Sequence, residues 1–235
     1  DRFDDENGGF GGRPKFPNTM SLDVLLRRGA LDGDKTARER VRRALDRMRE
    51  GGIWDHLRGG FHRYSTDERW LVPHFEKMLY DQALLARTYL EAYQVTGKPQ
   101  YAEVAREIFE YVLRDLRDPG GAFRSAEDAG EVGKEGEFYA WTPADLERAL
   151  GPRDAALAGR LYGVTDAGNF ERGTTILSLA AAPEAADQPD GLPADEVRER
   201  VSAARASLLA ARQQREHPHL DDKVLTDWNG LMIGA

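Results

Sequence analysis

Glycine pairs that lead into an aromatic residue divide this chain into segments with the apolar spacing of helices. They occur as Gly8-Gly9-Phe10, Gly59-Gly60-Phe61 and Gly120-Gly121-Ala122-Phe123, at intervals of 51 and 61 residues. A recurring helix–turn–helix unit with such a turn is typical of an α/α-hairpin toroid, in which each hairpin buries one face against its neighbours. With three occurrences and drifting spacing, chance recurrence is the alternative.

The periodicity of apolar residues predicts a mainly α chain. Start and stop signals give the expected helices: a short one from Asn18 or Thr19 to Leu26, one capped by Asp34 that stops at Gly51-Gly52, one over 75–95 closed by Gly97, one opened by Pro99, a short one begun by Thr142-Pro143, one over 194–214, and a last one capped by Thr226.

Glycine-marked segments between the helices predict short β-hairpins in the loops. We expect residues 121–125 to pair with 137–141 across a turn at 129–136, and 174–179 to form another strand. Residues 180–193 are rich in Ala, Pro and Asp, which predicts a mobile surface loop.

Composition excludes several classes of protein. Thirty-three basic and 41 acidic residues give a net charge of −8, which disfavours nucleic acid as a partner. The arginines crowded into 38–49 alternate with carboxylates at helical spacings, so we interpret them as a solvated helix face. No cysteine is present, and no apolar run is long enough to cross a membrane. We expect a cytoplasmic protein without membrane contacts.

Both ends of the chain predict a fragment of a longer protein. The first residue is Asp1, and the last five residues, Leu231 to Ala235, form an apolar run without a helix-stop signal. An incomplete toroid would expose helix faces, so we expect association or poor solubility.

Gly51 to Asp81 is the segment most suited to chemistry. It reads GGIWDHLRGGFHRYSTDERWLVPHFEKMLYD and contains three of the five histidines, with several aromatic, arginine and acidic residues. Loops that carry such groups on a helical scaffold are where binding sites concentrate. The alternative is a long loop whose aromatic residues pack only against each other.

Three residues of this segment are the catalytic candidates. Pro73 predicts a helix start that places His74 in the first turn, where the helix dipole would lower its pKa and favour a neutral general base. Asp81 would then lie on the same helix face and orient that base. His62, beside Arg63 and Tyr64, forms a donor-rich triplet suited to hydroxyl or carboxylate groups. A cap or packing role is the alternative for His74, and a buried capping or salt-bridge role is the alternative for Asp81.

A further set of polar and aromatic residues is predicted to bind a substrate. Glu127 and Asp128 could act as acid and base if their pKa values are pushed apart, although adjacent side chains usually diverge. The set comprises Arg63, Tyr64, Trp70, Glu76, Glu127, Asp128, Asp222, Trp228 and Asn229.

Two other motifs predict no site. His217-Pro218-His219 has the spacing of metal ligands but no second ligand pair, so a chance surface cluster is favoured. The glycine-rich start lacks the order of a phosphate loop. We expect no metal and no cofactor.

Four stretches together resemble a family of thioredoxin-domain-containing proteins: GGFGGRPKFP (8–17), GGIWDHLRGGFHRYSTDERWLVPHFEKMLYDQALL (51–85), SAEDAGEVGKEGEFYAWTPADL (125–146) and LDDKVLTDWNGLMI (220–233). The resemblance implies a thioredoxin-like domain followed by an (α/α)6 toroid of the six-hairpin glycosidase type, related to N-acylglucosamine 2-epimerases. Residues 1–235 would be the N-terminal part of that toroid, with the thioredoxin-like domain and the remaining hairpins outside this chain.

The chain departs from the family pattern in its acidic turn. The family reads like AEDADSEGEEGKFY there, whereas Ala129 is followed by Gly130 and Glu131 in this chain. A carboxylate and a hydroxyl are therefore missing or displaced. His56 also stands where a variable polar residue is expected, so His62 and His74 are the stronger candidates.

The toroid implied by the resemblance favours a carbohydrate-active domain, a sugar epimerase, isomerase or glycosidase, with a site around 51–81 and a small-molecule or sugar substrate. That step is an analogy between folds. The alternative is a non-catalytic binding or redox-adaptor module that works with the thioredoxin-like domain of the same protein.

Overall fold

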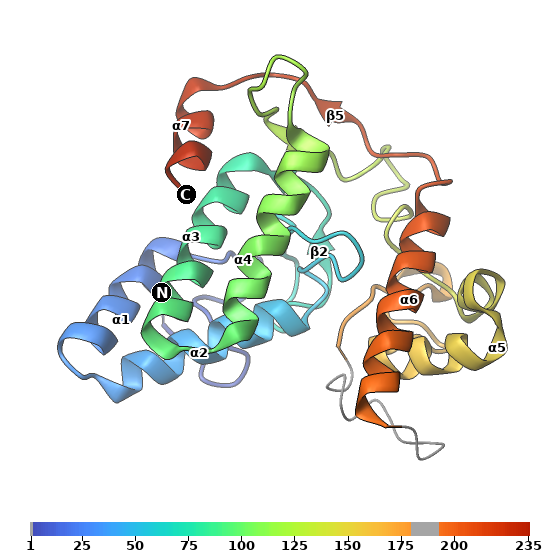
Figure 1. Ribbon diagram of the computed structural model, residues 1–235, viewed down its shortest axis with the longest axis horizontal. Coiled ribbons are helices and arrows are strands. Elements are labelled where there is room, and N and C mark those ends of the chain that lie inside the picture. The colour runs from blue at the N-terminus through green and yellow to red at the C-terminus, as the bar shows by residue number, and fades with distance from the viewer. Residues whose placement is uncertain (1, 180–192) are drawn as a thin grey trace. The chain divides into compact units, whose positions relative to one another are not determined.

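The computed structural model describes residues 2–179 and 193–235, and within them the chain is mainly α-helical, as predicted (Figure 1). It forms two compact units. The first comprises residues up to Ala129 together with Pro218–Ala235, and the second comprises Gly130–His217. The predicted loop at 180–193 lies outside the described residues except for Pro193.

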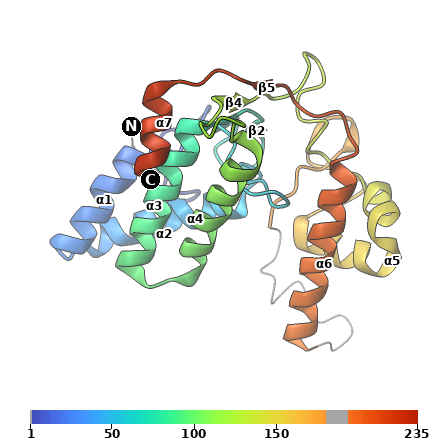
Figure 2. The same cartoon turned by 45° about the horizontal axis from the view of Figure 1, so that its top comes forward.

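The first unit is built from two antiparallel helical hairpins and a third, shorter helical element. The hairpins are α1 (Thr19–Leu31) with α2 (Lys35–Glu50), and α3 (Leu79–Thr96) with α4 (Pro99–Tyr111), which continues as a π-helical turn, η1 (Val112–Leu116). The C-terminal helix α7 (Thr226–Gly234) lies beside α3 in both cartoon views (Figures 1 and 2). Buried aromatic residues pack between the hairpins. Trp54 and Phe61, from the loop after α2, contact each other, and Phe61 stacks on Tyr89 of α3.

Each glycine-aromatic turn is closed by the same kind of backbone pairing. The aromatic residue forms an isolated antiparallel bridge to a residue a few positions upstream: Phe10 to Phe3, Phe61 to Trp54, and Phe123 to Arg117. Glycines in the left-handed region make these turns possible. At Gly60 (φ 81°) an added Cβ would lie 2.8 Å from the Tyr111 ring. The repeat seen in the sequence is therefore also a repeat of backbone structure.

Five two-residue strands connect the helices of the first unit. β1 (Tyr64–Ser65) pairs with β2 (Pro73–His74), and β3 (Lys77–Met78), β4 (Ala126–Glu127) and β5 (Leu220–Asp221) form a three-stranded sheet in that order. All pairings are antiparallel. The prediction of short β pairings in the loops is confirmed, but the predicted partners are wrong: Phe123 bridges Arg117, and Trp141 bridges Thr175.

The second unit contains α5 (Pro143–Tyr162), a short 3-10 turn η2 (Glu171–Gly173) and α6 (Ala194–Arg212). Thr142 caps α5 in a reciprocal capping box with Asp145, as the sequence predicts. The helix is longer than expected because it resumes after a kink at Gly151, whose φ of 74° is not helical. The predicted strand at 174–179 amounts to the single bridge at Thr175.

Helix boundaries differ from the predictions at three further places. Asp34 caps α2 through the Ala37 amide as expected, but α1 extends to Leu31, and Asn18 makes no side-chain cap bond. Thr226 is the first residue of α7 rather than its cap. The third difference, at residues 75–78, changes the interpretation of the candidate site.

Candidate functional site

His74 lies on a strand and not at the start of a helix. The predicted helix over 75–95 begins only at Leu79, because residues 73–74 pair with β1 and residues 77–78 pair with β4. The extended backbone of Met78 marks the boundary. The prediction of a helix-dipole environment for His74, with Asp81 on the same helix face, is therefore wrong.

The β1–β2 pairing nevertheless brings His74 to the other candidates. Tyr64 is the direct partner of His74, and the Arg63 amide donates to the Glu76 carbonyl at 2.8 Å. The side chains then meet at one carboxylate. Arg63 Nη1 lies 3.0 Å from Glu76 Oε2, and His74 Nε2 lies 3.1 Å from the same oxygen.

Tyr80 and Asp81 complete this group at the start of α3. Burial raises the pKa of Tyr80 above its usual value, Asp81 adds to the shift, and Arg63, its hydrogen-bond partner, opposes it. Burial would lower the pKa of Arg63, but its bonds with Glu76 and Tyr80 raise it. We call these five residues, Arg63, His74, Glu76, Tyr80 and Asp81, the Arg63 cluster.

Asp81 is the most perturbed group of the cluster. Burial raises its pKa to about 8, opposed by the charge of Arg63 and assisted by that of Glu76. Within the described part of the chain, its buried Oδ2 has no hydrogen-bond partner, and neither does Nε of Arg63. Asp81 is therefore a carboxyl group that is largely protonated near neutral pH.

Aromatic rings flank the cluster on two sides. Tyr64 stacks on His74 with ring centroids 4.9 Å apart and planes at 19°, and Phe16 packs against Tyr64 at 4.8 Å. Trp228 of α7 meets the edge of Tyr80 at 4.7 Å. Phe16 is 41% exposed, so this aromatic surface is accessible. Six of the predicted site residues thus come together: Arg63, Tyr64, His74, Glu76, Asp81 and Trp228.

Three predicted residues are occupied by internal contacts. His62 is buried, and its Nδ1 is 2.9 Å from the Phe75 carbonyl oxygen. Trp70 is fully buried beneath Lys15 and donates to the Asn7 carbonyl. Asn229 accepts from the amide of Phe123 and donates to its carbonyl, which fixes α7 to the loop before β4.

The predicted acidic residues near β4 and β5 have other neighbours. Glu127 accepts a hydrogen bond from Tyr111 at 2.9 Å. The Asp128 amide donates to the His219 carbonyl, and Asp222 is exposed beside β5. These contacts tie the segment to α4 and to the chain before β5, and the acid–base role of Glu127 and Asp128 stays a prediction.

Sequence reasoning left two features unassigned. Tyr80 bonds Arg63 and contacts Trp228, a pairing that its position next to Asp81 alone does not reveal. Lys77 and Asp55 form a fully buried ion pair at 2.6 Å, with Lys77 also donating to the Gly59 carbonyl at 3.1 Å. Alternation in the short strand β3 points Lys77 into the interior, away from the cluster.

Metal ligands and membrane spans are both absent from the described residues. No group of three or more His, Asp or Glu side chains there is arranged to hold a metal ion. No helix in the described ranges is long and apolar enough to span a membrane.

The fold and the cluster define a protein of helical hairpins that carries a polar, aromatic-flanked surface site. No family model matches the chain. Curated relatives do: human spermatogenesis-associated protein 20 is 40% identical over 99% of this chain, and the mouse protein is 38% identical over the same share. An uncharacterised protein of Caenorhabditis elegans is 33% identical over 98%. The chain is thus similar to spermatogenesis-associated protein 20 along almost its whole length. It spans 33% of the length of the human and mouse proteins and 35% of the nematode one.

Two solved structures show a weaker likeness. A sugar epimerase from a ruminal bacterium is 20% identical, with a TM-score of 0.47 over 66% of this chain and 43% of that chain. Cellobiose 2-epimerase from Bacillus thermoamylovorans is 13% identical, with a TM-score of 0.47 over 98% and 65%. At these scores the likeness decides neither the topology nor the activity.

Proposed function

We propose that this chain forms part of an α/α toroid and that its Arg63 cluster binds a sugar and catalyses proton transfer on it, as an epimerase or isomerase does. One observation carries the proposal: the unpartnered, high-pKa carboxyl of Asp81 lies in the same cluster as the Glu76 carboxylate held by Arg63 and His74. The recurring hairpin turn supports the toroid.

Epimerisation or isomerisation next to a carbonyl needs a base and an acid. The base removes the proton from the carbon beside the carbonyl, and the electron pair moves onto the carbonyl oxygen to give an enediol-like intermediate. Return of a proton to the other face, or to the neighbouring carbon, completes the reaction. Groups with separated pKa values suit these roles.

The cluster offers both roles. Asp81 is neutral below a pH of about 8 and so supplies the acid that protonates the developing oxygen anion. His74 and Glu76, joined at 3.1 Å, supply the base on the exposed side of the cluster. Tyr64, Phe16 and Trp228 offer the ring faces on which sugars stack.

Solvent exchange tests this proposal whichever sugar is the substrate. The chain is incubated in D2O with a panel of aldoses, ketoses and reducing disaccharides, and proton NMR follows the C2 position. We expect deuterium to enter one sugar, and Glu76→Gln and Asp81→Asn each to slow the exchange by at least about 100-fold. Glu103→Gln, an exposed carboxylate on α4, is the matched control and should leave the rate unchanged.

The outcomes separate the competing functions. Saturable sugar binding without exchange would support the non-catalytic binding module instead. Release of a reducing end from a disaccharide without exchange at C2 would support a glycosidase. Neither binding nor exchange with any sugar would reject the carbohydrate proposal.

A further inference from the structure

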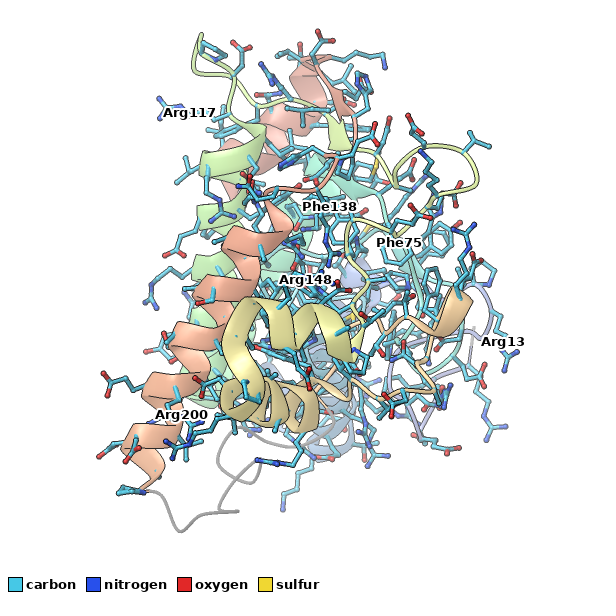
Figure 3. All side chains as sticks on the ribbon, turned by 90° about the vertical axis from the view of Figure 1, so that its right-hand side faces the viewer. Arg13, Phe75, Arg117, Phe138, Arg148 and Arg200 are labelled. Atoms are coloured by element: carbon cyan, nitrogen blue, oxygen red, sulfur yellow. The ribbon has the colours of Figure 1, made fainter. Side chains whose placement is uncertain are left out.

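The second unit contains a pocket that is independent of the Arg63 cluster. Its volume is about 330 Å³, which matches a small metabolite. It is bounded by the turn before Trp141, the first turn of α5, η2, and the residues just after α6. Figure 3 shows Phe138 beside the C-terminal end of α6, where Arg212 stacks on its ring.

Arg215 provides the pocket with a fixed cation. Its Nη1 donates to the carbonyls of residues 137, 138 and 140 at 3.2, 2.9 and 2.6 Å. Its guanidinium carbon lies 4.1 Å from the centre of the Trp141 ring. These contacts hold the plane of the guanidinium but use only one of its nitrogens, so Nε and Nη2 keep their donor capacity.

The charge of Arg215 has no direct counter-ion among the described residues. Its bonds there are to backbone carbonyls, which are neutral acceptors. Burial lowers its pKa, opposed by the more distant charge of Asp145. An arginine that is half-buried, oriented and short of an anion is suited to a planar carboxylate, which its two free donors match.

The rest of the lining rules out a strongly anionic ligand. Glu135 and Glu171 border the pocket and form no ion pair within the described ranges, whereas Arg172 and Lys134 are already paired, with Glu137 and Glu131 respectively. Arg172 is held with φ 55°, a left-handed conformation that is rare for a side-chain-bearing residue and is often found at functional sites. The unpaired groups among the described lining residues are thus one half-buried cation, Arg215, and two rim carboxylates.

We infer that this pocket binds a small zwitterion of the α-amino acid class, with its carboxylate on Arg215 and its ammonium group towards Glu171. A phosphate dianion would be repelled by the rim carboxylates, and a simple amine would leave Arg215 without its anion. The side chain of the amino acid would lie against Phe170, which also lines the pocket.

Calorimetric titration of the whole chain with individual amino acids tests this inference, with acetate, methylamine and inorganic phosphate as partial ligands. We expect at least one amino acid to bind saturably, and acetate and methylamine to bind at least about tenfold more weakly. Arg215→Lys keeps the positive charge but loses the paired N–H donors of the guanidinium. Glu171→Gln removes only the negative charge at the rim. Each variant should weaken binding at least about tenfold. Arg198→Gln, on the exposed face of α6, should have no effect.

The result is decided by comparing ligands and variants. Circular dichroism of each variant shows whether the fold is intact, and Glu171→Gln tests the site even if Arg215→Lys unfolds the turn. Phosphate or acetate binding as tightly as the best amino acid would overturn the inference, as would the absence of binding by every amino acid. The variants lie outside the Arg63 cluster, so loss of sugar exchange would not accompany loss of amino-acid binding.

Discussion

His74 stacks on Tyr64 because the two residues are direct partners in the β1–β2 pairing. Their ring centroids are 4.9 Å apart and their planes differ by 19°. The same pairing turns His74 Nε2 to within 3.1 Å of Glu76 and brings Glu76 to Arg63. Two very short strands thus assemble a polar group that the helix expected at this position would have dispersed.

Asp81→Asn should stabilise the chain at high pH. The folded-state pKa of Asp81 is raised from 3.8 to about 8, so between these values the unfolded state loses its proton first. Stability conferred by the neutral carboxyl is therefore full below pH 4 and falls as the pH rises towards 8. Urea unfolding is followed by tryptophan fluorescence. Relative to the parent chain, the midpoint urea concentration of Asp81→Asn should rise progressively from pH 5 to pH 8. A difference in midpoint between the variant and the parent chain that does not change with pH would contradict the raised pKa of Asp81.

Asp115→Asn should change stability with the opposite pH dependence, and it serves as the control for Asp81→Asn. Burial alone would raise the pKa of Asp115, but bonds from Arg58 and Arg114 lower it below its usual value. Its stabilising contribution is present above the unfolded pKa and is lost as the pH falls through the folded one. Asp115→Asn should therefore destabilise the chain at pH 7, and the difference from the parent chain should shrink on acidification.

Removing one partner of the buried Lys77–Asp55 pair should be severely destabilising. Both side chains are 1% exposed and lie 2.6 Å apart, so Lys77→Met leaves an uncompensated buried charge. The expected loss in the free energy of unfolding is about 3–5 kcal/mol. The double variant Lys77→Met with Asp55→Leu should recover part of it. If the two single losses simply add in the double variant, the pair does not act as a unit.

Gly60→Ala should cost more stability than Gly97→Ala. Both glycines have left-handed backbones, with φ of 81° and 70°. An alanine Cβ at Gly60 would lie 2.8 Å from Tyr111, whereas at Gly97 it meets nothing within 4 Å. We expect about 1 kcal/mol at Gly97 for the backbone alone and at least about twice that at Gly60. Equal losses would show that the contact with Tyr111 relaxes freely.

Asn229→Ala should loosen α7 from the rest of the first unit. Its side chain satisfies both the amide and the carbonyl of Phe123, and the substitution leaves these backbone groups without partners. The expected loss is about 1–3 kcal/mol. Hydrogen exchange at the Phe123 amide should accelerate, with exchange inside α2 as the internal control. If Asn229→Ala leaves the hydrogen-exchange rate of the Phe123 amide unchanged, Asn229 does not hold α7 in place.

Local signals predicted the helices well where a single residue determines the boundary. Asp34, Pro99 and the Thr142-Pro143 pair each start the helix that the sequence assigns to them. The prediction failed at Pro73, because a proline before an apolar-periodic run also fits an extended segment. Pro73 pairs with Ser65, and residues 77–78 of β3 pair with residues 126–127. Local periodicity contains no information about either set of partners.

The same limit explains the outcome for the candidate site. Composition picked out the segment 51–81, and six predicted residues meet in the structure. Tyr80 could not be separated from a core aromatic because its contact, Trp228, is far along the chain. Trp70 and Asn229 have the chemistry of ligand-binding residues, but they bond to the backbone of Asn7 and Phe123. Cytoplasmic location and a thioredoxin-like partner domain stay predictions.

The protonation of Asp81 is the central claim, and carbon-13 NMR of its carboxyl group measures it directly. A titration of the specifically labelled chain should give a midpoint near pH 8 for Asp81, whereas Asp115, whose pKa is lowered by its bonds with Arg58 and Arg114, should titrate below its usual range. Addition of the sugar that exchanges deuterium should shift the Asp81 midpoint and leave that of Asp115 unchanged. A midpoint near pH 4 for Asp81, unaffected by any sugar, would contradict the account.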